Sequence, residues 1–127
     1  MTETTPTTNR FLAHSGARLP IVQAPMGWIA RRQLASAVSN AGGLGIIETS
    51  SGETDNCKAE IEAMADLTAA PFGVNLPILF LRDDAMTRYI CDSGVKFVTT
   101  SAGSPAKFIG PLKEAGIVVY HAVPTVK

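Results

Sequence analysis

The chain has 127 residues, which is the size of one ordinary domain, and 46% of them are hydrophobic, which is enough for a packed core. Its formal net charge is zero, with 11 basic and 11 acidic residues. This balance argues against a nucleic-acid or membrane-surface partner, because both favour a basic excess. No apolar run reaches the roughly 18 residues that a membrane-spanning helix needs, so no span is predicted.

Residues 1–18 are predicted to form a flexible tail and lead-in, and residues 19–127 to form the domain. The first ten residues, MTETTPTTNR, are polar and lack the apolar segment of a signal peptide. A cytoplasmic location is therefore expected. Cys57 and Cys91 each fall in a predicted helix without metal-ligand spacing, which favours reduced, packed thiols and predicts no metal site.

Five short apolar runs, rich in Val, Ile or Phe, are typical of strands buried on both faces. They cover residues 19–24, 43–48, 71–76, 95–100 and 116–121. The segments between them carry apolar residues at helical spacing, and they cover residues 30–43, 55–67, 83–94 and 104–116. This alternation, with no hairpin turn, predicts an α/β fold with a parallel sheet in the order 1-2-3-4-5 and helices on its outer face.

Glycine and proline refine these boundaries. The glycine cluster of AGGLG, residues 41–45, precedes the second strand, where it serves a helix end and close packing. Gly94 is expected to end the third helix, and Gly110-Pro111 to kink or break the last one.

Two architectures fit this pattern: an open doubly wound sheet, or part of a (β/α)8 barrel. The phosphate-binding fingerprint of the first, G-x-G-x-x-G, is missing after the first strand. In both architectures, ligands bind at the carboxyl ends of the strands. Those ends fall at residues 24–27, 48–50, 75–77, 99–103 and 120–121.

The strand ends are poor in charge and rich in hydroxyls, small residues and backbone. They suit a large, flat, mostly apolar ligand with a few hydrogen-bonding atoms, such as a flavin. Structural alternatives stay open. Pro25 could simply end a strand, and Met26 could fill core. Asn75 could form an Asx turn, and His121 could be a hydrogen-bonded packing histidine.

Taken together, the segments 20–27, 34–48, 71–76, 98–105 and 116–127 resemble the N-terminal half of the nitronate monooxygenase family, also called 2-nitropropane dioxygenase-like proteins. The resemblance implies a flavoprotein with FMN bound in a TIM (β/α)8 barrel, of which this chain holds about the first five strands. It implies an oxidoreductase that oxidises alkyl nitronates with O2. Ala24, Pro25 and Met26 would contact the flavin ring, Asn75 would hydrogen-bond it, and Thr100 and Ser101 would lie near it.

The family's catalytic histidine, in a Gly-Gly-His segment, and its phosphate-binding loops correspond to positions beyond Lys127. The chain is therefore expected to be a fragment or a truncated product, with no catalytic residue of its own and inactive alone. Open sheet edges predict self-association. Two alternatives remain: an FMN-dependent enoyl reductase of fatty-acid synthesis, and a non-catalytic half-barrel that assembles with another chain.

Overall fold

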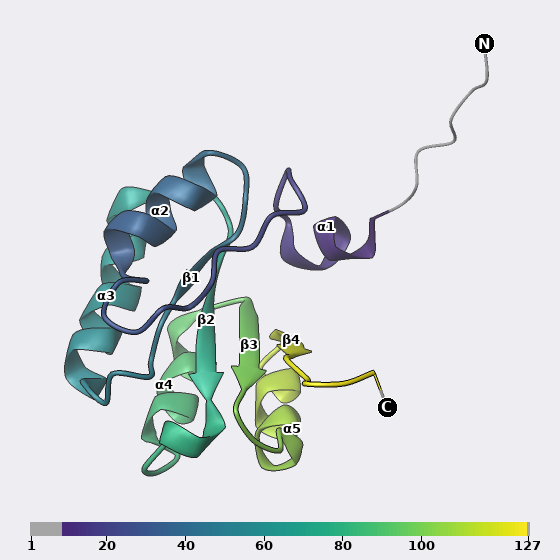
Figure 1. Cartoon of the computed structure of the whole chain (residues 1–127). Coiled ribbons are helices and arrows are strands. Elements are labelled where there is room, and N and C mark those ends of the chain that lie inside the picture. Colours follow the sequence, from purple (N-terminus) through teal and green to yellow (C-terminus); the bar gives the residue numbers. More distant parts are fainter. Residues whose placement is uncertain (1–8, 127) are drawn as a thin grey trace.

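The computed structural model of the chain describes residues 9–126, where a parallel sheet carries a layer of helices (Figure 1). The strands are β1 (Gly45–Ile47), β2 (Phe72–Pro77), β3 (Phe97–Ser101) and β4 (Val118–His121). Helices α2 (Arg32–Asn40), α3 (Thr54–Leu67), α4 (Ala85–Ser93) and α5 (Ala106–Glu114) alternate with them. The predicted strand-helix alternation is confirmed. Of the predicted tail and lead-in, residues 1–18, the first eight lie outside the described residues, and the remainder contains a short helix, α1 (Arg10–Ser15).

The strands lie in the order β1-β2-β3-β4, and every neighbouring pair is parallel. The register aligns Asn75 with Thr99, and Thr99 with Tyr120. A doubly wound sheet reverses its order at a switch point, whereas a (β/α)8 barrel keeps sequential order throughout. The sheet is therefore built like an arc of a barrel. Among residues 9–126, no helix combines the length and apolar character that crossing a bilayer requires.

The first of the five predicted strands, at 19–24, is not formed, so this prediction is wrong. This segment makes a single parallel bridge, between Val22 and Leu44. The next rung would need an N–H from Pro25 to the Ile46 carbonyl, and proline has none. The side chain of Gln23 takes that place: its Nε2 donates to the Ile46 carbonyl at 3.0 Å, and its Oε1 accepts from the Ile46 N–H at 3.4 Å. The segment thus lies along the edge of β1 without becoming a strand.

One face of the sheet is covered by α2 to α5. Ile47, Val74, Leu76 and Val98 point from the strands into this core. They meet side chains from every helix of the layer: Ala35, Cys57, Ile61, Met64, Met86, Ile90, Phe108 and Leu112. Gly45 is needed here, because a Cβ on it would lie 2.0 Å from the Ala35 carbonyl oxygen. The predicted close packing at AGGLG is therefore confirmed.

The opposite face carries a smaller apolar cluster of Ala17, Leu44, Ile46 and Phe97. A short helix that the sequence did not suggest, α1 (Arg10–Ser15), packs Phe11 and Leu12 against it. The Phe11 ring meets the rings of Phe97 and Tyr120 edge-on, each with centroids 6.1 Å apart. We call this side of the sheet the free face, because α2 to α5 all lie on the other side.

The helix ends follow local chemistry in part. Gly94 follows α4 in the left-handed conformation, at φ 83°, as predicted. The predicted break at Gly110-Pro111 is absent, because α5 runs continuously from Ala106 to Glu114 with Pro111 inside it. Phe108 and Leu112, on either side of the proline, are both buried against the sheet. Their burial offsets the hydrogen bond that proline removes.

Candidate functional site

Three polar side chains meet at the carboxyl ends of β2 and β3. The Asn75 side-chain Nδ2 donates to Thr99 Oγ1 at 2.8 Å and to Ser101 Oγ at 3.3 Å, and Ser101 Oγ donates back to Asn75 Oδ1 at 3.4 Å. Side chains alternate along a strand, and Val74 and Leu76 face the helices, so Asn75 faces the free face. The amide bonds across to the next strand, so the Asx-turn alternative is wrong.

Thr100 is separated from this group. Its side chain lies on the helix-covered face, in the same row as Val98, and is fully buried. Its Oγ1 lies 2.8 Å from Nδ1 of His121, its aligned partner on β4. The structure thus brings Asn75 and Ser101 together and points the Thr100 side chain away from them. His121 is a hydrogen-bonded histidine on the covered side, as its structural alternative supposed.

The Ala24-Pro25-Met26 segment continues from the bridge at Val22 into a loop, residues 24–30, at the same edge of the sheet. Ala24 is exposed, Pro25 is half-buried and Met26 is 42% exposed. The loop then turns back on itself, because the Ala30 N–H donates to the Met26 carbonyl at 2.8 Å. The Ala30 carbonyl in turn accepts from the Glu48 N–H at 2.9 Å. The loop is therefore tied to the end of β1.

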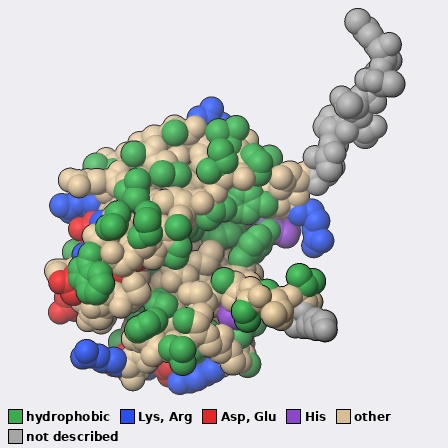
Figure 2. Space-filling model, in the orientation of Figure 1, with side chains coloured by type: hydrophobic (Ala, Val, Ile, Leu, Met, Phe, Trp, Pro, Cys, Tyr) green, Lys and Arg blue, Asp and Glu red, His purple; other side chains and the backbone are tan. Residues whose placement is uncertain are grey.

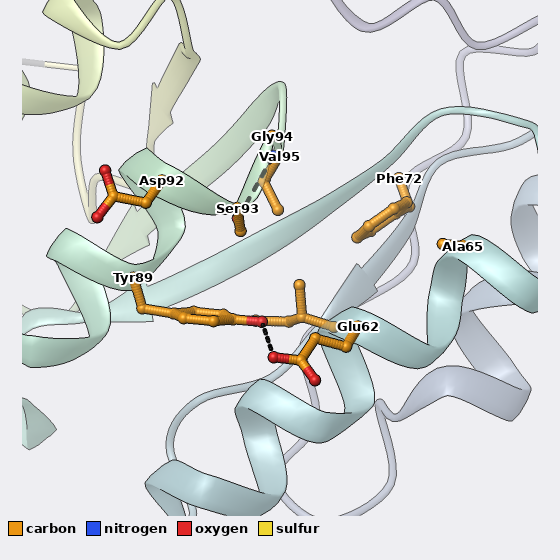
Figure 3. A pocket seen from close by; sticks show the side chains of 9 residues that line it. Glu62, Ala65, Phe72, Tyr89, Asp92, Ser93, Gly94 and Val95 are labelled. Carbon is orange, nitrogen blue, oxygen red and sulfur yellow. Dashed lines mark hydrogen bonds between the residues drawn. The ribbon is translucent and has the colours of Figure 1, made fainter.

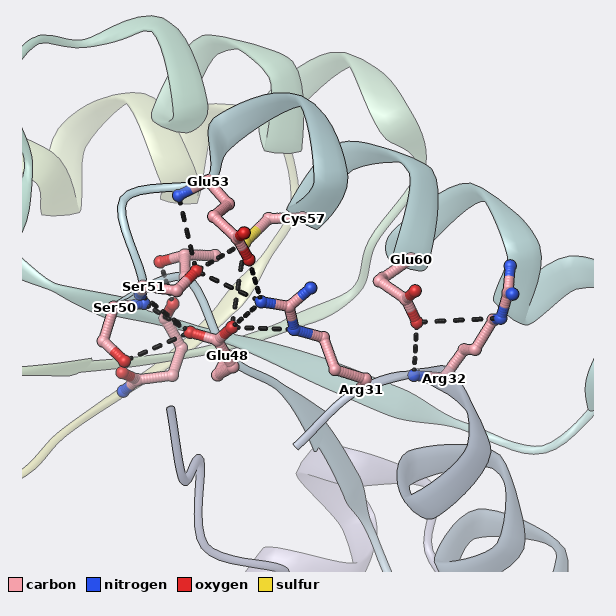
Figure 4. A network of polar contacts seen from close by, with 10 residues as sticks. Arg31, Arg32, Glu48, Ser50, Ser51, Glu53, Cys57 and Glu60 are labelled. Atoms are coloured by element: carbon pink, nitrogen blue, oxygen red, sulfur yellow. Dashed lines mark hydrogen bonds and ion pairs between the residues drawn. The ribbon is translucent and has the colours of Figure 1, made fainter. Parts of the chain in front are cut away.

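Beside this loop lies a network of charged and hydroxyl groups centred on Glu48 (Figure 4). Nε of Arg31 donates to Glu48 Oε1 at 2.8 Å, and Nη2 of Arg31 donates to Glu53 Oε2 at 2.7 Å. Glu48 Oε2 accepts from the backbone N–H groups of Ser50, at 2.7 Å, and Ser51, at 3.0 Å. Cys57 Sγ lies at the rim, 4.0 Å from Glu48 Oε1.

Burial alone would raise the pKa of the Glu48 carboxyl. The N–H of Ser51, the hydroxyl of Ser50 and the charge of Arg31 outweigh this effect, and the pKa falls below its ordinary value. Glu48 is thus a fixed buried anion. Burial raises the pKa of the Cys57 thiol, which keeps it protonated and unsuited to nucleophilic chemistry.

Two loops at the carboxyl edge of the sheet contain strained backbone. Trp28 has φ 60° and Ala102 has φ 53°, in the left-handed region that residues with side chains rarely adopt. Such positions cost about 1–3 kcal/mol each and gather at functional sites. The sequence reasoning missed both residues, and it missed the role of Arg31. A signal for Arg31 existed, because a glutamate that ends the apolar run GLGIIE must find a cation if it is buried.

Two grooves lie away from the strand ends, whereas a third cavity, of about 260 Å³, lies between the loops that follow β1 and β2 and includes Thr49 and Leu81. A groove of about 340 Å³ lies between α3 and α4 (Figure 3). It includes Phe72, at the amino end of β2, and Val95, just before the amino end of β3. Another, of about 460 Å³, lies between α4 and α5 on the outer surface. Ligands of parallel sheets bind at the carboxyl ends, so neither groove is the candidate site. Figure 2 shows hydrophobic side chains gathered in a hollow between the α1 side and the β4 side of the molecule.

The chemistry of the site is that of binding. The free face offers an amide, two hydroxyls and strand-end backbone, and no cluster of metal-binding side chains was found within residues 9–126. Neutral hydrogen-bonding groups beside apolar surface suit an uncharged, planar, partly polar ligand. The charged network around Glu48 is already internally paired and faces the 24–30 loop.

Comparisons with known proteins identify the family and the fold. A sequence profile of the family described as nitronate monooxygenase matches residues 9–89. The chain is 45% identical over 69 residues to a nitronate monooxygenase of Pseudomonas aeruginosa, covering 54% of this chain and 20% of that protein. It is also 34% identical over 112 residues to a Mycobacterium tuberculosis protein named (3aS,4S,5R,7aS)-5-hydroxy-7a-methyl-1-oxo-octahydro-1H-indene-4-carboxyl-CoA dehydrogenase, covering 88% of this chain and 32% of that protein.

Solved structures show the same fold. FabK from Thermotoga maritima superposes with a TM-score of 0.85 at 35% identity, covering 90% of this chain and 37% of that chain. A nitroalkane oxidase from Streptomyces ansochromogenes superposes with a TM-score of 0.80 at 26% identity, covering 92% and 43%. Both are TIM barrels, so the sheet is an arc of such a barrel. The chain spans about a third or less of the length of the curated relatives described here.

Proposed function

We propose, since the chain belongs to the nitronate monooxygenase family, that it forms part of the FMN site of an oxidoreductase that oxidises alkyl nitronates with O2. FMN, when bound, would supply the redox chemistry. This chain would contribute binding and orientation through Ala24, Pro25, Met26, Asn75 and Ser101, with Thr100 lying near the flavin. No catalytic proton transfer is assigned to the described residues.

The observation that carries the proposal is the Asn75 amide on the free face. Its Nδ2 is occupied by Thr99 and Ser101, and its Oδ1 receives one long bond, from Ser101. An amide oxygen has two lone pairs, so Oδ1 retains an acceptor position for an N–H of a flavin ring. Asn75 is 4% exposed, and its orientation is fixed by β3 before a ligand binds.

The experiment uses the full-length protein, by which we mean the product of the native coding sequence, including any residues encoded after Lys127. Asn75→Ala should weaken FMN binding by about 1–3 kcal/mol, the cost of leaving a buried polar partner unpaired. The control is Asn40→Ala. Asn40 also makes two side-chain hydrogen bonds, to the Leu67 carbonyl and to Thr68, but at the far end of α2. Unchanged FMN retention in Asn75→Ala would refute the assignment.

One other function has specific support. FabK, an FMN-dependent enoyl reductase, shares the fold at a TM-score of 0.85, and the mycobacterial relative is named as a dehydrogenase of a CoA ester. The same strand-end site would then serve a reductase or dehydrogenase acting on a thioester. NADH consumption with an enoyl thioester, set against nitronate-dependent O2 uptake by the same full-length preparation, separates the two functions.

A further inference from the structure

We propose that Glu48 and Arg31 are positioning residues for the flavin site, because their ion pair holds the 24–30 loop at the carboxyl edge of the sheet. The inference rests on the proposed function, since this loop carries Pro25 and Met26. Neither charged group is assigned a contact with flavin or substrate. They act through the backbone of the loop.

The loop is anchored at its two ends and has few ties between them. At the start, the Gln23 side chain bonds to the backbone of Ile46. At the end, the Ala30 carbonyl accepts from the Glu48 N–H. Between these anchors, the backbone hydrogen bonds of Met26, Ile29 and Ala30 stay within the loop. The position of Pro25 and Met26 relative to the sheet is therefore set by these two end attachments, at Gln23 and at Ala30.

The Glu48 carboxylate joins this loop to the next one. Its Oε1 is held by Arg31, which directly follows the loop, and its Oε2 is held by Ser50, through both the backbone N–H and the hydroxyl. A Cβ on Gly27 would lie 3.0 Å from Ser50 Oγ, so the loop rests directly on the serine that Glu48 fixes. A shift of the carboxylate is thereby transmitted to both the middle and the end of the loop.

The energetics favour a geometric role. The Glu48 side chain is 1% exposed and that of Arg31 19%, and a buried ion pair contributes little net stability because desolvation offsets its attraction. The pair does fix positions, because the planar guanidinium of Arg31 donates to Glu48, Ser51 and Glu53 at once and can do so in few orientations. A misplacement of about 1 Å at a reacting centre costs about 10²-fold in rate.

The neighbouring pair supplies a matched control. Arg32 lies 3.8 Å from Glu60, with its side chain 48% exposed, and Figure 4 shows the two pairs side by side. Both pairs join an arginine to a glutamate, and the two arginines are adjacent in the sequence. Among residues 9–126, the hydrogen bonds and ion pairs of the Glu60 carboxylate go to Arg32 alone, to its backbone N–H and its guanidinium.

The test compares Glu48→Gln and Arg31→Met with Glu60→Gln in the full-length, FMN-loaded protein. Glu48→Gln replaces one carboxylate oxygen with an NH2 group, which must face a donor on either side: the Arg31 guanidinium or the N–H groups of Ser50 and Ser51. We expect Glu48→Gln and Arg31→Met, the two network variants, to lower kcat by about 10–10²-fold and to shift the flavin absorption bands. Glu60→Gln should change neither kcat nor the absorption bands. The double variant should lose no more than the worse single one, because the two groups act as one unit.

Trp28 reports on the loop independently of flavin, because it lies inside the loop with 67% exposure. Its signal is isolated by subtracting the fluorescence of Trp28→Phe. The two network variants should lower Trp28 anisotropy, and Glu60→Gln should not. If Glu48→Gln does not fold, Arg31→Lys keeps the charge and loses the planar fork, and it should show the same changes at smaller size.

Unchanged Trp28 anisotropy and kcat in folded Glu48→Gln and Arg31→Met would overturn the proposal. So would losses of activity that follow the fall in Tm equally in all three variants, since these would mark a merely structural role. A full-length protein that binds no flavin refutes the proposed function instead, and Trp28 then still tests whether the pair holds the loop.

Discussion

Gly45→Ala should be among the most damaging single-methyl changes in the chain. The added Cβ would lie 2.0 Å from the Ala35 carbonyl oxygen and 2.6 Å from its carbonyl carbon, whereas ordinary contact begins at 3.4 Å. Both atoms belong to the backbone of α2, so no side-chain rotation relieves the clash. The helix must move outward by about 1.4 Å. A gap of even 0.5–1 Å forfeits about a quarter to a half of each contact that it opens.

Overpacking of a core costs about 1–3 kcal/mol, and more where the structure cannot adjust. We therefore expect Gly45→Ala to lose at least about 3 kcal/mol, a large part of the roughly 5–15 kcal/mol that stabilises a domain. Urea unfolding of the full-length protein, followed by far-UV circular dichroism, measures the loss. Gly110→Ala is the control: outside the adjacent residues and the backbone of its own helix, no described atom would lie within 4 Å of the added Cβ, so its effect should stay within about 1 kcal/mol. A Gly45→Ala effect equally small would show that the packing of α2 on β1 is not as close as described.

Two further predictions concern groups in α4. The Thr87 hydroxyl is buried and has no hydrogen-bond partner among residues 9–126, so Thr87→Val should be neutral or stabilising by about 1–3 kcal/mol in the same urea assay; a clear loss would reveal a hidden partner. Burial, then the hydrogen bond to Glu62, raises the pKa of Tyr89 to about 12. An unfolded tyrosine titrates near about 10, so the stability that Tyr89 contributes is complete below that pH and is lost as the pH rises to about 12. Tyr89→Phe should flatten the stability profile in this window, and a profile identical to the parent's would contradict the reasoning.

The sequence alone determined the order and type of the main elements. Continuous apolar runs marked β1 to β4, because these strands are buried on both faces of the sheet. Apolar residues at helical spacing marked α2 to α5, because each of these helices is buried on one side. The strand-end position of Asn75 was also readable, since the carboxyl ends of parallel strands share one edge. The glycines of AGGLG were correctly interpreted as close packing, and α1 left no comparable signal.

The tertiary structure decided what depends on contacts between distant residues. The 19–24 segment has the composition of a strand, but Pro25 lacks the N–H that its ladder needs, and a Gln23 side chain completes the pairing. Thr100 and Ser101 are neighbours in sequence, but their side chains face opposite sides of the sheet. Two adjacent residues at one strand end therefore do not both present side chains to the same site. Arg31 pairs with Glu48, 17 positions further along the chain, and Trp28 has a strained φ in the 24–30 loop that precedes Arg31. Local sequence cannot specify such pairs, because each is selected by the packing of a loop against a strand end.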